Sequence, residues 1–207
     1  MAETLYKVTG ANGSACHGGT GTWRPNRWRS VNGELIACQR GLHLVSRNQL
    51  IGWLGPVIWE AEYDGERLDA PDKIVVRRAR LIRRLDTWND RTARLFAADC
   101  AEHVLPIFER AYPTDDRPRK AIEAARAYAR GEISAAARDA AGGAAWAAAG
   151  AVAGAAGAVA GAAWAAAGDA AGDAAGAVAG AAWAAAGDAF QRWAIARLFQ
   201  YLDGELS

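Results

Sequence analysis

The sequence predicts the α+β fold class: a small N-terminal mixed β-sheet domain with one short helix, followed by an Ala/Gly-rich all-α helical bundle. Two observations predict it. Apolar residues alternate in short runs before residue 89, and then recur every three to four positions, as on one face of a helix. The composition also changes, because residues 135–189 are nearly all Ala, Gly, Val and Trp with a few Asp. We place the domains at residues 1–89 and 90–207.

Turn-forming residues separate the expected strands of the N-terminal domain. The Asn-Gly pair at residues 32–33 is a strong hairpin signal. Ser46 is a candidate helix N-cap, and the Asp-Gly pair at residues 64–65 predicts a turn. Pro25 predicts an irregular or edge segment, because proline cannot donate to a ladder. The expected strands are residues 5–8, 35–38, 41–45, 57–63 and 73–85, and the expected helix is residues 47–54.

Helical spacing of apolar residues starts at Asp90, and either Thr87 or Asn89 is expected to cap this first helix. Pro106 lies late in the run and is expected to kink or end the helix, because its ring clashes with the preceding turn. At the other end of the domain, residues 190–202 have the apolar spacing of a conventional amphipathic helix.

Two further helices are expected between these. Pro118 suits the first turn of the second helix, with one of the aspartates at 115–116 as its cap. Gly131 is expected to end this helix, and Ser134 to start the next one.

The Ala/Gly tract contains an internal duplication. The fourteen residues 157–170 recur at 176–189, and a related block occupies residues 144–150, which is typical of repeated helical units. Glycine costs a helix up to about 1 kcal/mol relative to alanine, so a glycine stripe starting at Gly143 requires close approach of another backbone. Breaks are expected at residues 142–143 and 172–176. The expected packing seam, within the chain or in a homo-oligomer, comprises Gly150, Gly154, Gly157, Gly161, Trp146, Trp164 and Trp183.

A membrane span is the main alternative for this tract. Residues 144–168 carry no charge and are long enough to cross a bilayer. They contain no Leu, Ile or Phe, however, and Asp169 and Asp173 follow at once without a basic cluster nearby. A soluble helical bundle is therefore favoured over a membrane span. Disorder is a third alternative, against which the recurrence of Trp argues.

The charge and cysteine content bound the class of protein. The net charge is +1, with 13 Lys/Arg and 9 Asp/Glu in residues 1–89, and 11 and 14 in residues 90–207. This mild asymmetry gives the whole chain no nucleic-acid or membrane signature. Cys16, Cys38 and Cys100 are widely spaced and odd in number, so a disulfide framework is not expected. The first residues lack the pattern of a signal peptide, so we expect a cytoplasmic protein.

The C-terminal domain resembles a known family. Residues 100–109 (CAEHVLPIFE), 115–132 (DDRPRKAIEAARAYARGE) and 191–205 are similar to the immunity protein family of bacterial polymorphic-toxin systems. In that family an Ala/Trp-rich helical tract follows such segments, and a Trp-bearing helix closes the domain. The resemblance implies a protein partner and a bacterial or phage origin, but no mechanism.

The N-terminal domain resembles a domain of unknown function found in phage and bacterial proteins, which implies no established chemistry. The residues that carry this resemblance are Tyr6, Lys7, Val8, Cys38, Gly41, Leu42, His43, Glu60, Glu62, Asp72 and Lys73.

One motif suggests an enzyme. Residues 17–20 (His-Gly-Gly-Thr) resemble the His-Gly-Thr motif of ADP-ribosyltransferases, and residues 41–44 resemble the later strand of that family. The resemblance implies an NAD-using transferase, for which Glu60 or Glu62 is the candidate catalytic carboxylate. The alternative is a turn that carries an incidental histidine.

Cysteine and histidine side chains allow one metal hypothesis. Cys16, His17, Cys38 and His43 could together ligate zinc, but their spacing matches no standard zinc motif. His43, between two leucines, is either a buried strand histidine or a pocket residue with a pKa near neutral. We expect no catalytic residue, no metal and no cofactor.

Arginine and tryptophan interleave in the N-terminal domain. Such a set suits the backbone and stacked bases of nucleic acids, and it equally suits an acidic protein. The alternative is a solvated face of an alternating strand. The candidate ligand-binding residues are Trp23, Arg27, Trp28, Arg29, His43, Arg78 and Arg80.

Three functions follow, in order of preference. The first is a non-enzymatic immunity-like or phage–host conflict protein that binds and neutralises a protein partner. The second is binding of a nucleotide or nucleic acid through the basic N-terminal face. The third is an ADP-ribosyltransferase-like enzyme that uses NAD.

Overall fold

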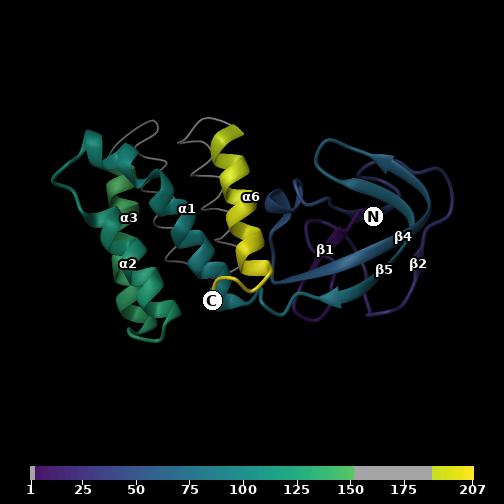
Figure 1. Cartoon of the computed structure of the whole chain (residues 1–207), viewed down its shortest axis with the longest axis horizontal. Helices are drawn as coiled ribbons and strands as arrows, with labels where there is room; N and C mark the ends of the chain where they lie inside the picture. The colour runs from purple at the N-terminus through teal and green to yellow at the C-terminus, as the bar shows by residue number, and fades with distance from the viewer. Residues whose placement is uncertain (1–2, 152–187) are drawn as a thin grey trace. The chain divides into compact units, whose positions relative to one another are not determined.

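The computed structural model describes residues 3–151 and 188–207, and it confirms the α+β class (Figure 1). The chain divides into two compact units, Met1–Trp88 and Asn89–Ser207, which we call the N-terminal unit and the helical unit. All the described strands lie in the N-terminal unit, and the described elements of the helical unit are α-helices. Whether residues 1–89 and 90–207 fold as separate domains stays a prediction.

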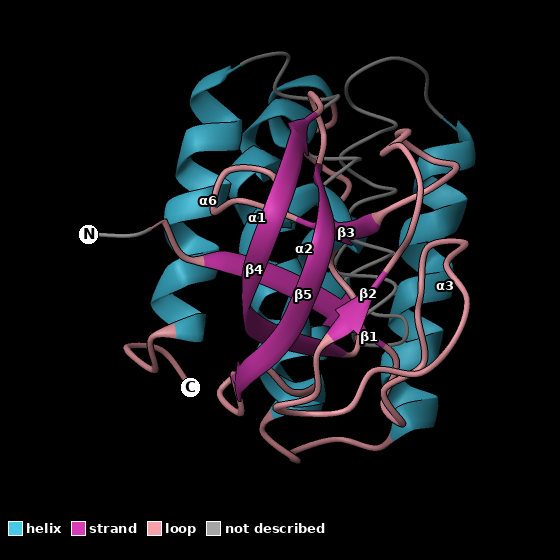
Figure 2. Cartoon of the chain, turned by 90° about the vertical axis from the view of Figure 1, so that its right-hand side faces the viewer, coloured by secondary structure: helices cyan, strands magenta, loops and turns pink. Residues whose placement is uncertain are grey.

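The N-terminal unit is built on an antiparallel five-stranded sheet with the order β1-β4-β5-β2, in which β3 also pairs with β5 (Figure 2). The strands are β1 (Leu5–Thr9), β2 (Arg29–Ser30), β3 (Leu42–Leu44), β4 (Val57–Asp69) and β5 (Ile74–Arg84). The long strands β4 and β5 lie side by side and are the frame on which the shorter strands are placed.

Apolar alternation in β5 forms the core of this unit. Val76, Ala79 and Leu81 are fully buried, and they pack with Leu5 of β1 and with Trp23. Burial of such side chains contributes roughly 25 cal/mol for each Å² of apolar surface removed from water. The strands predicted at residues 5–8, 41–45 and 73–85 are therefore formed, with small shifts at their ends.

The strand predicted at residues 35–38 is wrong, and so is the hairpin before it. Ile36 makes only an isolated bridge to Arg40, closed by a hydrogen bond from the Arg40 N–H to the Ile36 carbonyl at 2.8 Å. Cys38 has a φ of 64°, in the left-handed region that turns rather than strands use. Gly33 also has a positive φ, but the described residues on either side of it do not pair with one another as the strands of a hairpin. A tight turn over residues 36–40 takes the place of the strand.

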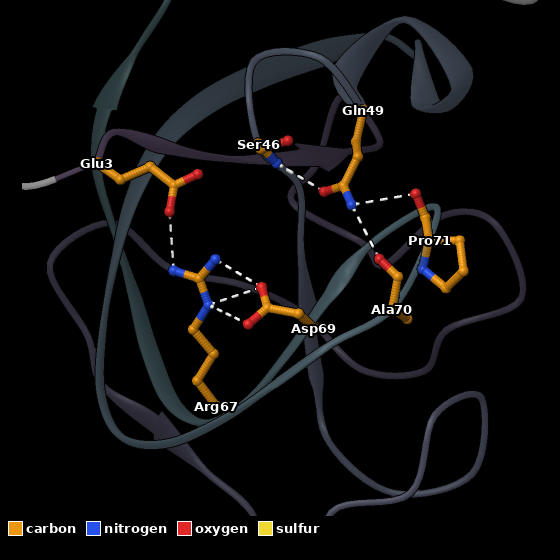
Figure 3. Close-up of polar contacts among 7 residues, drawn as sticks. All are labelled: Glu3, Ser46, Gln49, Arg67, Asp69, Ala70 and Pro71. Carbon is orange, nitrogen blue, oxygen red and sulfur yellow. Dashed lines mark hydrogen bonds and ion pairs between the residues drawn. The ribbon is translucent and has the colours of Figure 1, made fainter.

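The helix predicted at residues 47–54 is only a short 3-10 helix, Leu50–Trp53. The residues that lead into this helix are held by the side chain of Gln49, and no cap from Ser46 forms (Figure 3). The Gln49 amide accepts from the Ser46 N–H at 3.0 Å, and it donates to the carbonyl of Ala70 at 3.1 Å and to that of Pro71 at 3.4 Å. Because the side chain spans two segments, local propensity alone could not place this element.

The turn predicted at residues 64–65 is wrong, because β4 continues through it. A register shift between Asp64 and Arg67 absorbs the extra residues as a bulge, and Gly65 takes the positive φ that the bulge requires. Beyond the bulge, the Arg67 guanidinium donates to Asp69 and, at 2.8 Å, to Glu3 (Figure 3). These contacts hold the end of β4 to the segment that precedes β1.

The described helices of the helical unit are α1 (Asp90–Ala111), α2 (Arg117–Ala129), α3 (Ala135–Ala151) and α6 (Asp188–Leu202). Asn89, not Thr87, caps α1: its side chain accepts from the Thr92 N–H at 3.2 Å, and its own N–H donates to the Thr92 hydroxyl at 3.0 Å. Pro106 does not end the helix, which continues to Ala111. It is exposed, so water can solvate the carbonyl that loses its partner.

The residues predicted to begin and end α2, and to begin α3, lie at the positions expected for them. Asp116 occupies the cap position without a side-chain hydrogen bond, while Asp115 accepts from the Arg117 N–H at 3.2 Å. Gly131 ends the segment with a φ of 76°. The Ser134 hydroxyl accepts from the backbone N–H three residues later at 3.2 Å, and α3 follows.

The break predicted at residues 142–143 is wrong, because α3 runs through both glycines. Gly143 is exposed, and a Cβ added there would meet no atom within 4 Å, so it does not lie in a packed seam. Flanking alanines are the best helix formers and offset the glycine cost. Trp146 and Gly150 belong to α3, but the structure does not describe how they pack. Gly154, Gly157, Gly161, Trp164, Trp183 and the break at 172–176 also lie outside the described residues.

The helices are joined by charged and aromatic contacts as well as by apolar packing. Asp99 of α1 is buried and accepts from Arg126 of α2, and from Arg197 and Tyr201 of α6, each at 2.7 Å. Tyr128 of α2 has two cations over its ring, from buried arginines of α1 and α3. Among the described residues, no helix is long and apolar enough to cross a bilayer.

We predict that the two domains are separable by protease. Limited proteolysis of the full chain should cut first near residues 87–90 or 112–117, where exposed residues such as Thr87 and Pro113 lie outside regular structure. Fragments identified by mass spectrometry should then begin near residue 90 or residue 113. A first cut inside Val57–Asp69 or Ile74–Arg84 would contradict the boundary.

Candidate functional site

The predicted basic–aromatic set is placed on β5 and the segment before β2. Arg78 and Arg80 of β5 both stack on the ring of Trp28, at 4.4 and 4.8 Å from its centroid. Each also has a carboxylate partner on β4: Arg78 donates to Asp64 at 3.1 Å, and Arg80 donates to Glu62. The cations that were expected to attract an anion are therefore already paired.

This pairing is part of a cross-strand ladder that the sequence interpretation missed. Arg77 pairs with Glu66 and Arg83 pairs with Glu60. As in the two pairs beside Trp28, the arginine lies on β5 and the acid on β4. The signal was present, because acidic residues occupy every second position from 60 to 66, although the predicted strand ended at residue 63 and a turn was predicted at 64–65. Opposite charges on adjacent strands stabilise a sheet by roughly 0.2–1 kcal/mol per pair and reduce its attraction for outside charges.

The remaining predicted ligand residues are divided between core and surface. Trp23 is buried, and its ring lies beneath Lys7 at 5.2 Å and Arg29 at 4.8 Å, so it offers no open face for a base. Arg27 is exposed. His43 is half-buried on β3, and its backbone carbonyl accepts from the Lys7 ammonium at 3.0 Å. The assignment of these residues to a ligand site stays a prediction.

A shallow pocket, which we call the Lys7 pocket, lies on the N-terminal unit. It encloses about 260 Å³, including space open to solvent. Its lining comes from β1, from the loop after β1, from β3 and its following residue, and from the 3-10 helix. The lining residues are Tyr6, Lys7, Val8, Cys16, His17, His43, Val45 and Trp53.

The loop after β1 is held tightly against the 3-10 helix. The His17 ring donates through Nε2 to the Trp53 carbonyl at 3.1 Å, and it meets the Trp53 ring edge-on at 5.2 Å. The thiol of Cys16 donates to the Val8 carbonyl at 3.4 Å, and burial raises the pKa of this thiol. Gly55 lies close to β1, since a Cβ there would lie 2.8 Å from a Val8 methyl.

The residues that line the pocket bear on the transferase hypothesis and on the zinc hypothesis. His17 and His43 both line it, but Glu60 and Glu62, the candidate catalytic carboxylates, are paired in the ladder and are not among its lining residues. A pocket without a carboxylate lacks the group that this chemistry needs. The zinc alternative does not form either. In the part of the chain that the structure describes, no three His, Cys, Asp or Glu side chains are placed to hold a metal ion.

An aromatic cluster joins α1 and α6 in the helical unit. The exposed His103 ring stacks on Trp193, with centroids 4.0 Å apart and planes at 23°. Phe190 lies beneath, at 5.6 Å from His103 and 5.7 Å from Trp193. Partial desolvation lowers the pKa of His103, which favours the neutral, stacked ring. We call His103 and Trp193 the aromatic stack.

Comparison with known families identifies the class. Residues 83–194 match a family model described as Imm-5 like putative immunity protein. The match covers more than half of the chain and includes α1, α2 and α3, so the chain belongs to this family. The resemblance stated for residues 100–109 and 115–132 is confirmed, whereas the match does not extend to residues 1–82. No curated protein and no solved structure matches the chain.

We predict that the aromatic stack makes stability depend on pH. The pKa of His103 is lower in the folded chain than its ordinary value near 6.5, so the unfolded chain binds more protons between those two values. Stability should therefore fall as pH drops from 7 to 5. The loss attributable to one exposed ring should be under about 1 kcal/mol. Urea unfolding should show a smaller loss in His103→Gln than in the wild type; equal losses would contradict this assignment.

Proposed function

We propose that the chain is a non-enzymatic immunity protein that binds a protein toxin and neutralises it. The observation that carries this proposal is the family match over residues 83–194. The same residues form most of the helical unit, so the proposal assigns partner binding to helices and leaves the N-terminal unit a separate role. The three cysteines are free thiols, which fits action in the reducing bacterial cytoplasm.

We place the centre of the contact surface at the aromatic stack. Trp193 is half-buried, so part of its ring remains accessible while His103 fixes its orientation. Tryptophan is enriched among the residues that contribute most to protein–protein affinity. A ring that is already held in place loses little conformational freedom on binding, which favours affinity. Glu102, Gln191 and Arg192 are exposed neighbours in sequence that can supply a polar rim.

The charge of the helical part favours a basic partner. Residues 90–207 contain 14 acidic and 11 basic residues. Such complementarity increases the rate of association with a positively charged surface. Binding of a nucleotide or nucleic acid at Arg78 and Arg80 is less well supported, because both guanidiniums have carboxylate partners.

We predict that the chain protects cells from a toxin encoded by the adjacent gene. Co-expression in bacteria should restore growth, and Trp193→Ala should weaken binding of the purified toxin by tenfold or more, since loss of a central anchor costs about 2 kcal/mol. Trp28→Ala is the matched control, because Trp28 is also half-buried but lies in the N-terminal unit. Circular dichroism should show both variants folded.

Two outcomes separate the parts of this proposal. Failure of the wild-type chain to restore growth would overturn the immunity function. Restored growth with unchanged affinity of Trp193→Ala would retain that function and overturn the aromatic stack as the contact.

A further inference from the structure

Lys7 is a partly buried cation without a carboxylate partner among the described residues. Its ammonium donates to the His43 carbonyl at 3.0 Å and lies 5.2 Å from the centroid of the Trp23 ring. Throughout residues 3–151 and 188–207, no Asp or Glu forms an ion pair with it. In the same sheet four arginines of β5 pair with acids of β4, and Lys73 pairs with Asp72 at 3.0 Å. Among the described residues Lys7 lacks such a counter-charge, as does Arg29, which lies over the same Trp23 ring.

The surroundings increase the need for an anion. Burial is the main reason that the pKa of Lys7 is lowered to about 8, and the positive charge of Arg29 lowers it further. The pKa of Cys16 is raised by burial, so this thiol stays neutral and supplies no negative charge at neutral pH. A partly desolvated ammonium that keeps only one hydrogen bond to the protein gains when a bound group brings the opposite charge.

The other polar groups of the pocket are donors or can become donors. The Nε2 of His17 is engaged with the Trp53 carbonyl, which leaves Nδ1 to donate when the ring is protonated. His43 also lines the pocket. Burial and the charge of Lys7 lower the pKa of His43, and a bound anion would reverse the second effect. No lining residue is acidic, so nothing in the lining repels a negative charge.

We propose that the Lys7 pocket binds the oxyanion head group of a small ligand, a phosphate or a carboxylate, with Lys7 as the principal contact and His17 and His43 as further donors. The pocket is partly open to solvent, so a head group held against Lys7 would leave the rest of the ligand in solvent. The Trp53 ring, fixed edge-on to His17, forms an apolar wall beside that position. Phosphate is preferred to carboxylate, since it carries more charge and more acceptor oxygens. This site is independent of the proposed immunity function.

The composition of the chain provides a direct test. It contains three lysines: Lys7, Lys73 and Lys120. The aspartates beside Lys73 and Lys120 raise the pKa values of these two, whereas the pKa of Lys7 is lowered. In the full chain labelled with ¹³C at lysine Cε, one resonance should therefore titrate near pH 8 and two should titrate above their ordinary range. Lys7→Met assigns the first resonance.

Titration with inorganic phosphate, adenosine monophosphate and acetate then tests binding. We expect saturable shifts of the Lys7 resonance alone, a rise in its pKa, and calorimetric affinity that falls about tenfold or more in Lys7→Met. Arg40→Met is the matched control and should bind normally, because Arg40 is an exposed cation of the same unit that does not line the pocket. Lys7→Met should fold, since it removes an uncompensated, partly buried charge and retains an apolar side chain of similar length.

The three probes distinguish the ligand source. Response to phosphate and adenosine monophosphate, with little response to acetate, indicates a phosphate group, whereas comparable responses indicate any oxyanion. An unmoved Lys7 resonance would overturn the site, and so would equal shifts of all three lysines. Equal affinity of wild type and a folded Lys7→Met variant would also overturn it.

Discussion

In the helical unit, side chains from two other helices converge on the buried carboxylate of Asp99. Arg126 comes from α2, whereas Arg197 and Tyr201 come from α6, which follows the Ala/Gly tract in sequence. A carboxylate removed from water is tolerated only when such donors replace its hydration. The donors are in turn held by it: the pKa of Tyr201 is raised by burial and by Asp99, which keeps the hydroxyl protonated and donating. This contact fixes α6 to α1, and therefore places Trp193 beside His103.

The two units use charge in opposite ways. The sheet of the N-terminal unit pairs four arginines of β5 with acids of β4, which neutralises part of a face that the composition suggests is basic. Lys7, on β1 of the same sheet, is left with a carbonyl and an aromatic ring. A charge compensated within the fold contributes to stability, whereas one that is left uncompensated favours a ligand. The proposed function therefore rests on the helical unit, and the proposed oxyanion site on the other.

Sequence periodicity predicted the elements whose contacts are local. The cap at Asn89 and the strand Ile74–Arg84 are specified by adjacent residues, so both could be anticipated. The segment at residues 35–38 could not, because a turn closed by Arg40 competes with its apolar pattern. Of the site, His43 was identified by its position in a strand, but Lys7 was not. Its significance is the absence of a partner among the described residues, and no spacing in one sequence reveals which cation a fold leaves unpaired.

The central claim is that Asp99 and α6 stabilise the helical unit together, and a double-mutant cycle tests it most directly. Asp99→Ala, Tyr201→Phe and the double variant would be unfolded in urea as full chains, with the transition of the helical unit followed by circular dichroism. The account predicts a coupling free energy of about 1 kcal/mol or more, because Tyr201 donates to Asp99 at 2.7 Å in a buried setting. Additive effects, with a coupling near zero, would contradict it.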